Sequence, residues 1–383
     1  MKRLALLTAS LVVADGILYL GLRRLDSSRI FYDRSNAVSA HRLEFFAAHS
    51  YDAELGWDLE RGAKNRLGGR RGARDPDLGR YQAKAFGDSF TFGSDVDSDE
   101  TWPAFVERQT GWHCLNYGVP GYGTDQALLK YRRTPVPTDF TILGIQQENI
   151  GRLVSVYRAF YMEDWGPTKP RFIVEGQGLR LDPNPIGSRE QLRRLLDPAF
   201  VEALRRKDYW ARYNEDILGA PDRLRWPALW TVLRHGRFFL DRAALESRLR
   251  LRPSYQDEAR RFKPYHLYQE ASEALEILVR LIDAFAAECR QRGERPLVLI
   301  IPLQHTVDLM KTYGRCLYQP LTRRLSQRGV PHLDFGPVFV KERYGDYYRP
   351  YNGHLSPKGN QRVARQVVEA LRRESSGAKG QTE

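Results

Sequence analysis

The chain has 383 residues, of which 42% are apolar, enough to bury a full-sized core and to exclude disorder on a global scale. Its formal net charge of +13 at pH 7 would suit nucleic acid or an anionic membrane surface. The basic residues are spread along the whole chain and no nucleic-acid-binding motif is visible, so we expect no nucleic-acid partner.

The first segment is an apolar run from Leu4 to Leu22 that follows two basic residues. Its length is close to the roughly 20 residues that a helix needs to span a bilayer. The run fits an uncleaved anchor, a signal peptide cut after Val12-Val13-Ala14, or a buried helix of a cytoplasmic protein. Asp15 near its centre is costly in lipid, which favours cleavage or a helix that pairs with a partner. We predict that residues 1–25 are a signal anchor or signal peptide. The protein is then extracytoplasmic, held at the cytoplasmic membrane by this segment.

Residues 26–80 form a polar connector without a long periodic segment. From Tyr81 onwards, short apolar runs alternate with segments of helical period, which predicts a parallel sheet with helices on both faces. The predicted strands are Tyr81–Phe86, Trp112–Asn116, Phe140–Gly144, Pro296–Pro302 and Val330–Phe335. The predicted helices are Trp102–Gln109, Asp125–Arg132, Gln269–Arg290, Val307–Gln327 and Pro357–Arg373.

A long interruption, residues 152–265, separates the third and fourth predicted strands. It begins with a hairpin pattern from Phe172 to Leu181 and continues with Arg- and Leu-rich helical segments. Because this stretch is too long for a loop, we predict an inserted cap subdomain between two parts of the α/β domain, residues 81–151 and 266–374. The small, polar residues 375–383 predict a disordered tail. The three cysteines show no CxxC spacing, which indicates no zinc site and leaves room for one bridge and one free thiol.

Ser89 is the candidate nucleophile. The first predicted strand ends in Gly87-Asp88-Ser89, where a glycine permits the tight turn that exposes a serine hydroxyl at the start of a helix. Ligands of a doubly wound sheet bind at the carboxyl ends of its strands, which is where this serine lies. A serine is a weak nucleophile, so it needs a base within hydrogen-bond reach.

Three further segments follow later strands at the same edge of the sheet. The glycine-rich run Asn116 to Thr124 offers backbone amides for an oxyanion hole, with Gly121 as the candidate donor. After the third strand, the side-chain amide of Asn149 is a second candidate donor. His354 lies in the loop after the last strand and is the candidate base.

These four segments, in this order, resemble the blocks of SGNH hydrolases, the GDSL-like lipase and esterase family, in its membrane-anchored or exported bacterial form. The resemblance covers about residues 52–371 without the insertion, and Tyr51 to Trp57 is similar to a stretch that precedes the serine block in anchored members. It implies a flavodoxin-like three-layer α/β/α sandwich and a serine activated by histidine. The implied oxyanion donors are the Ser89 and Gly121 amides and the Asn149 side chain. Neither a metal nor a cofactor is implied.

The sequence departs from the family pattern at two blocks. Asn149 lies between Glu148 and Ile150, whereas the family reads Gly-x-Asn-Asp. The family also places an aspartate two or three residues before the histidine, where this chain has Asn352 and Tyr351. An asparagine oxygen orients the ring without stabilising its positive charge. The chain therefore has a Ser89-His354-Asn352 arrangement, a dyad completed by a carboxylate such as Asp346 or Asp334, or a weakened site.

The leading interpretation is a serine esterase, O-acetyl hydrolase or acyltransferase that acts on acyl groups of an envelope or exported polysaccharide. Hydrolase and transferase share an acyl-enzyme and differ only in whether water or a sugar hydroxyl accepts the acyl group. A catalytically weakened carbohydrate-binding or assembly protein is the first alternative, favoured by Asn352. The second is a lipase or lysophospholipase in which the helices of the insertion form a membrane-facing lid.

Overall fold

A five-stranded, all-parallel sheet forms the centre of the molecule in the computed structural model, which describes residues 2–26, 38–72, 81–161, 167–216, 219, 221, 224, 226–260, 262–351 and 353–379. Its strands are β3 (Tyr81–Phe86), β4 (Cys114–Asn116), β5 (Thr138–Ile145), β8 (Arg295–Ile300) and β9 (His332–Asp334). The spatial order is β4-β3-β5-β8-β9. This is the flavodoxin-like order, which reverses direction between β3 and β5. The predicted α/β architecture is confirmed.

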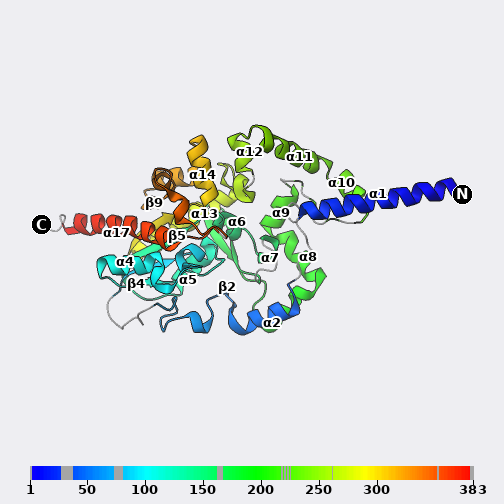
Figure 1. Ribbon diagram of the computed structural model, residues 1–383. Helices are drawn as coiled ribbons and strands as arrows, with labels where there is room; N and C mark the ends of the chain where they lie inside the picture. Colours follow the sequence, from blue (N-terminus) through cyan, green and yellow to red (C-terminus); the bar gives the residue numbers. More distant parts are fainter. Residues whose placement is uncertain are drawn as a thin grey trace.

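Helices cover both faces of the sheet (Figure 1). One layer contains α5 (Thr124–Arg132), α13 (Glu273–Gln291) and α15 (Gln319–Gln327). The other contains α4 (Trp102–Thr110), α14 (Gln304–Tyr313), α16 (Gly336–Val340) and α17 (Pro357–Lys379). Successive side chains of each strand point to opposite faces of the sheet. Ala85 and Ile142 pack under α4 and α17, whereas Phe86 and Leu143 pack under the layer of α5 and α13.

One buried ion pair lies inside the α5 and α13 layer. Lys84 of β3 and Glu294, just before β8, have an Nζ–Oε1 distance of 2.6 Å. The hydroxyls of Thr141 and Tyr131 donate to the other carboxylate oxygen at 2.6 and 3.1 Å. Burial lowers the pKa of Lys84, while the contact with Glu294 opposes this shift. The ion pair and the two hydroxyls therefore connect β3, β5 and α5 to the residue that precedes β8.

The insertion contains the expected hairpin, β6 (Arg171–Glu175) and β7 (Gly178–Asp182). The helix α6 (Asn149–Leu153) crosses the predicted start of the insertion, and the 3-10 turn η4 (Lys263–Tyr268) crosses its predicted end. The helices between them are α7 (Arg158–Tyr161), α8 (Pro198–Lys207), α9 (Tyr209–Asp216), α10 (Ala228–Arg234), α11 (Gly236–Leu251) and α12 (Tyr255–Ala259), with the 3-10 turn η3 (Glu190–Leu196). Phe172, Leu195 and Trp210 belong to the same buried cluster as α13. The first part of the insertion therefore shares the core of the sheet domain.

Several boundaries differ from the sequence prediction. The connector contains α2 (Ala40–His49), β1 (Tyr51–Asp52), β2 (Gly56–Trp57) and η1 (Arg61–Ala63). The helix predicted over 307–327 is split into α14 and α15, because Gly314 adopts a positive φ of 64° and ends α14 as a left-handed cap. The last helix continues to Lys379, beyond the start of the predicted tail. Short helices α3 (Ser89–Phe92), η2 (Ser98–Glu100) and η5 (Tyr344–Tyr347) complete the fold, and the three cysteines are free.

The N-terminal helix α1 (Lys2–Asp26) projects from the body beside α10, away from the end of α17 (Figure 1). Residues Ala5–Arg23 have a mean hydropathy of 1.9, and only 11% of their most apolar window is buried. A helix of this length and composition is consistent with either a signal sequence or a membrane anchor.

Candidate active site

The turn after β3 presents Ser89 at the edge of the sheet. Gly87 has a φ of 152°, and a Cβ at this position would lie 2.5 Å from the carbonyl oxygen of Gly144. The side chain of Asp88 accepts a 2.9 Å hydrogen bond from the Phe90 amide and so caps the short helix α3. Ser89 is the first residue of that helix. A glycine and a capping aspartate thus place the hydroxyl where the sequence predicted it.

His354 lies within reach of this hydroxyl. Its Nε2 is 3.0 Å from Ser89 Oγ, and its Nδ1 is 2.5 Å from Asp95 Oδ2. A carboxylate at Nδ1 favours the tautomer that carries its proton there, which leaves Nε2 free to accept the serine proton. The Phe90 ring packs against the imidazole edge-to-face, with 5.6 Å between ring centroids. The side chains of Ser89, His354 and Asp95 form one hydrogen-bonded series, in the order that a nucleophile, its base and an orienting carboxylate would require.

Asp95 is the residue that the sequence analysis missed. It lies six residues after Ser89, in the loop that follows α3, and has a φ of 67°. Among the described residues it is the one non-glycine residue with a positive φ, a conformation that aspartate tolerates better than most residues. Its backbone oxygen accepts a 3.2 Å bond from the guanidinium of Arg349, which ties the Asp95 loop to the segment before His354.

The carboxylates that the sequence analysis considered have other partners. Asp346 forms a 2.6 Å ion pair with Lys358, and Asp334 accepts a 2.8 Å bond from the Tyr318 hydroxyl. Neither has a hydrogen bond to His354 in the described part of the chain. Asn352 lies outside the described residues, so its predicted orienting role stays a prediction.

The glycine-rich loop lies directly against the serine turn. The Val119 amide donates to Gly87 O at 3.0 Å, and Asn116 Nδ2 donates to Thr91 O at 2.8 Å. Within the described ranges, the amides of Ser89 and Gly121 have no intramolecular acceptor. Two free N–H groups at a strand end are what an oxyanion hole requires. The role predicted for both amides stays a prediction.

Asn149 contacts Asp88 instead of standing free. Its Nδ2 donates to Asp88 Oδ2 and to Tyr122 O, each at 3.0 Å, and its Oδ1 accepts from the Gln146 amide at 2.7 Å. Since both amide protons are engaged, one of these bonds has to open before Asn149 can donate to an oxyanion. Its predicted role as the third donor therefore requires a rearrangement.

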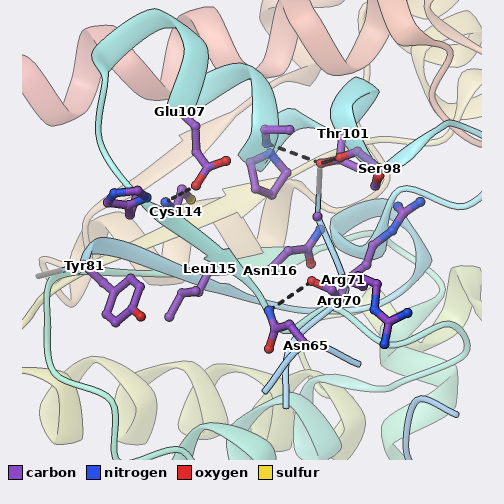
Figure 2. A pocket seen from close by; sticks show the side chains of 14 residues that line it. Asn65, Arg70, Arg71, Tyr81, Ser98, Thr101, Glu107, Cys114, Leu115 and Asn116 are labelled. Carbon is purple, nitrogen blue, oxygen red and sulfur yellow. Dashed lines mark hydrogen bonds between the residues drawn. The ribbon is translucent and has the colours of Figure 1, made fainter. Parts of the chain in front are cut away.

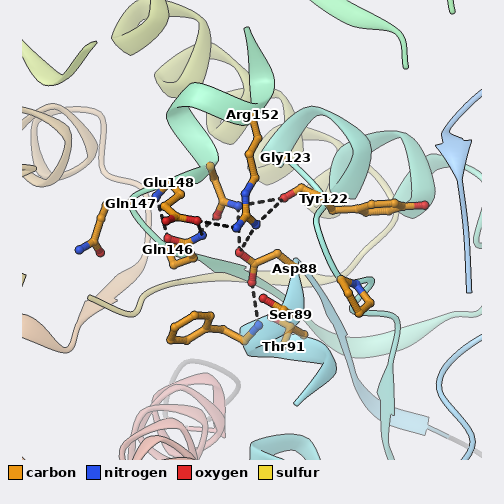
Figure 3. Close-up of polar contacts among 12 residues, drawn as sticks. Asp88, Ser89, Thr91, Tyr122, Gly123, Gln146, Gln147, Glu148 and Arg152 are labelled. Atoms are coloured by element: carbon orange, nitrogen blue, oxygen red, sulfur yellow. Dashed lines mark hydrogen bonds and ion pairs between the residues drawn. The ribbon is translucent and has the colours of Figure 1, made fainter. Parts of the chain in front are cut away.

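Arg152 is a second residue without a signal in the sequence. It lies on α6, about one turn after Asn149. Its guanidinium donates to Asp88 Oδ2 at 3.0 Å and to Glu148 Oε2 at 2.7 Å (Figure 3). The Asp88 and Arg152 side chains are buried. A buried carboxylate needs such a partner, and this pair holds Asp88, the residue that precedes Ser89, in place. Helical spacing alone could have placed positions 149 and 152 on one face of α6, but not opposite Asp88.

An apolar cavity of about 360 Å³ lies beside the glycine-rich loop. Phe92, Val119 and Pro120 form its wall on the side of the site, and the connector forms the rest with Val38, Leu43, Phe45, Phe46, Trp57 and Leu59. Trp57 Nε1 donates to Pro120 O at 3.1 Å, so β2 supports the loop that carries Gly121. The connector therefore builds part of the surroundings of the site.

A smaller cavity of about 50 Å³, lined by both polar and apolar groups, lies between α4, β4 and residues 65–72 (Figure 2). None of the candidate catalytic residues lines it, and its volume suits about one or two water molecules. In the parts of the chain that the structure describes, no group of three or more His, Cys, Asp or Glu side chains is placed to hold a metal ion.

No protein-family model and no curated protein matches the sequence. Solved structures are similar to it over most of its length. A lipase/acylhydrolase from Enterococcus faecalis is 10% identical, covering 76% of this chain and 95% of that one, with a TM-score of 0.35. A member of the lipolytic protein G-D-S-L family from Veillonella parvula is 13% identical, covering 76% and 99%, with a TM-score of 0.35. An acetyl xylan esterase from Butyrivibrio proteoclasticus is 10% identical, covering 79% and 66%, with a TM-score of 0.32.

At these scores the likeness carries no inference about activity or substrate, so functional assignment depends on the site itself. The observed strand order and the serine turn agree with the architecture that the sequence blocks predicted. Structural neighbours of this five-stranded α/β fold include GDSL-type lipolytic proteins, over 76% of the chain, and an esterase, over 79%.

Proposed function

We propose that this chain is a serine ester hydrolase or O-acyltransferase that works through an acyl-enzyme on Ser89. The series Ser89, His354 and Asp95 is the observation that carries the proposal, with contacts of 3.0 and 2.5 Å. A base at this distance can take the hydroxyl proton while the oxygen attacks an acyl carbon. The Asp95 carboxylate stabilises the imidazolium that results. Its presence supports an active enzyme over a weakened binding protein.

The reaction begins when Ser89 Oγ attacks the ester carbonyl and its proton moves to His354 Nε2. The carbonyl electrons move onto the oxygen, and the free amides of Ser89 and Gly121 donate to the developing charge. Each such donor contributes about 10²–10³ in turnover in other acyl-transfer enzymes. Collapse of the tetrahedral species expels the alcohol, which leaves with the proton from His354. The acyl group stays on Ser89.

The second half of the reaction regenerates the serine. Water or a sugar hydroxyl gives its proton to His354 and attacks the acyl carbon, and Ser89 Oγ departs and regains the proton. The substrate we propose is an acylated carbohydrate of the cell envelope or of an exported polysaccharide, with acetyl as the acyl group. The apolar N-terminal helix supports a location outside the cytoplasm.

The test is covalent labelling. A fluorophosphonate probe is expected to label the purified wild-type protein, and chromogenic acetate esters are expected to be hydrolysed. Ser89→Ala should lose both signals while its circular dichroism is unchanged. Ser326→Ala, an exposed position on α15, serves as the matched control and should keep both. Labelling that persists in Ser89→Ala would reject the assignment of the nucleophile.

The apolar cavity favours a second candidate, an esterase for longer acyl chains of the lipase or lysophospholipase class. Phe92 and Pro120 belong to the two segments that also contain Ser89 and Gly121. A volume of about 360 Å³ exceeds what an acetyl group needs. Rates on p-nitrophenyl esters from acetate to decanoate separate the two candidates. A maximum at acetate supports the carbohydrate esterase, and a maximum at longer chains supports the lipase.

A further inference from the structure

Asp15, the charged residue within the apolar helix α1, has its partner inside the chain. Its Oδ2 accepts a 2.9 Å bond from the Ala228 amide, and its Oδ1 accepts a 2.7 Å bond from the Leu229 amide. These are the first two amides of α10, which lack partners within their own helix. A carboxylate that accepts two N–H bonds is cheaper to place in an apolar medium than a free one.

Side-chain packing continues this contact along α1. Leu22 and Ala228 are buried, with Leu18, Val232 and Phe239 packed around them. Tyr19 meets Trp226 edge-to-face, with 6.0 Å between ring centroids. The C-terminal half of α1 and the α10 segment therefore form one unit, joined by both hydrogen bonds and apolar contacts.

The outer surface of this unit is apolar and exposed. Trp226, Leu229, Trp230 and Leu233 recur at spacings of three and four residues, and Trp230 and Leu233 are 65% and 67% exposed. We refer to these four residues as the α10 patch. The neighbouring positions Arg234 and Arg237 are exposed and basic. A contiguous exposed apolar patch with a basic rim is typical of an interaction surface.

We propose that the α10 patch is a membrane-inserted surface that enters the interface of the same bilayer as α1. The commitment to lipid rests on continuity, since the patch adjoins the one apolar helix long enough to span a membrane among the described residues. Tryptophan is enriched at the membrane interface, and arginines near it contact anionic headgroups. The protein is then held by two elements, an anchor and a shallow second contact.

The depth of the patch fits this location. Asp15 precedes Arg23 by eight residues, which corresponds to about 12 Å along a helix. If Arg23 lies among the headgroups, the start of α10 lies in the outer part of the acyl-chain region, below the headgroup boundary. Interfacial helices bury their apolar face about 5–10 Å into this region. Asp15 then sets the level at which α10 enters the bilayer.

The test uses tryptophan fluorescence of the full-length chain in vesicles of phosphatidylcholine and phosphatidylglycerol with brominated acyl chains. Bromine quenches only tryptophans that contact the lipid. Wild-type emission should be quenched relative to unbrominated vesicles. The double variant Trp226→Phe/Trp230→Phe should lose the quenched component. Trp112→Phe, at a half-buried position stacked on Phe140, is the matched control and should retain it.

Asp15→Ala tests the link between the two elements. It removes the acceptor for the α10 amides, so the chain should still co-float with vesicles through α1 while the quenching of Trp226 and Trp230 falls. Equal quenching in wild type and in the Trp226/Trp230 double variant would overturn the proposal. The proposal would also be overturned if tryptophan emission were the same in brominated and unbrominated vesicles and the protein had twice its molecular mass in detergent. A second copy of the chain would then cover the α10 patch. Fluorophosphonate labelling of every variant reports that the catalytic domain is intact.

Discussion

Asp95 and His354 are 259 positions apart in the sequence and yet share a hydrogen bond. The serine, the histidine and the glycine-rich loop were predictable, because each follows a strand and strand ends converge at one edge of a parallel sheet. The carboxylate partner of the histidine was not, because we sought it only in the stretch from Asp334 to Asn352, which precedes His354. A loop that follows one strand can place a side chain against a residue that follows a different strand. The spacing of residues in the sequence does not reveal where such a side chain points. The backbone conformation of Asp95 becomes visible only in the structure.

The first prediction concerns this acid. Asp95→Asn should keep the fold and lower kcat by about 10⁴, the size of the loss when the corresponding aspartate of serine proteases is replaced by asparagine. The neutral amide cannot stabilise the imidazolium by charge, and it can turn its NH₂ donor instead of its oxygen acceptor toward Nδ1. Ester hydrolysis under saturating substrate measures the change. Asp346→Asn, which breaks only the surface pair with Lys358, is the control and should retain full turnover. Equal rates in the two variants would exclude Asp95 from the mechanism.

A second prediction at the same scale concerns Asn352. Because Asp95 already occupies Nδ1 of His354, a second carboxylate at position 352 has no vacant ring nitrogen to bind. Asn352→Asp should therefore leave turnover near neutral pH level or reduce it. The pH-rate profiles of wild type, Asn352→Asp and Asp95→Asn provide the measurement. A clear rise in Asn352→Asp would mean that position 352 orients the ring and that Asp95 does not.

At the scale of elements, β3, the first strand of the parallel sheet in chain order, was predicted to the residue. The ends of the other four strands of this sheet were predicted to within a few residues. Buried strands are easy to recognise because both faces are apolar and turn residues bound them. Residues 40–49 were missed because their helix has a single fully buried residue, Leu43, and hence little apolar periodicity. The sequence predicted α14 and α15 as one helix for a related reason: the apolar residues before and after Gly314 fit a single helical period.

The third prediction concerns the contact between the glycine-rich loop and α3. A Cβ on Gly118 would lie 2.7 Å from the carbonyl carbon of Thr91 and would overlap the backbone of Phe92. Gly118→Ala should therefore shift α3, which carries Ser89, and lower both kcat and the thermal midpoint. Gly62→Ala, where a Cβ meets nothing within 4 Å, is the matched control and should change neither. Thermal melts and ester hydrolysis on the same samples give the comparison, and normal activity in Gly118→Ala would show that the loop is free to move.

At the scale of the whole molecule, the buried pair of Lys84 and Glu294 links β3 to the segment that precedes β8. Glu294→Ala leaves the buried ammonium of Lys84 without its carboxylate, which should cost about 3–5 kcal/mol in the free energy of unfolding. The exposed pair of Glu175 and Arg180 offers the comparison, because Glu175→Ala should cost at most about 1 kcal/mol.

Urea denaturation measures both variants. The double variant Lys84→Met/Glu294→Leu should recover much of the loss, since it removes the unpaired charge together with its partner. A cost for Glu294→Ala as small as that for Glu175→Ala would mean that water reaches Lys84 in the folded protein.

The placement of the catalytic side chains along the chain has a consequence for synthesis. Ser89 and Asp95 follow the first strand of the sheet, whereas His354 precedes α17, and α17 is joined to α4 by a 3.0 Å bond from the Trp102 amide to Asn360. In the proposed mechanism, a nascent chain that has emerged as far as β5 contains Ser89 but not yet His354, the base that activates it. We expect such a chain to be inactive toward esters until β9 and α17 have joined the domain. Activity should then appear only when the last elements have docked, so a polypeptide truncated before His354 should show none.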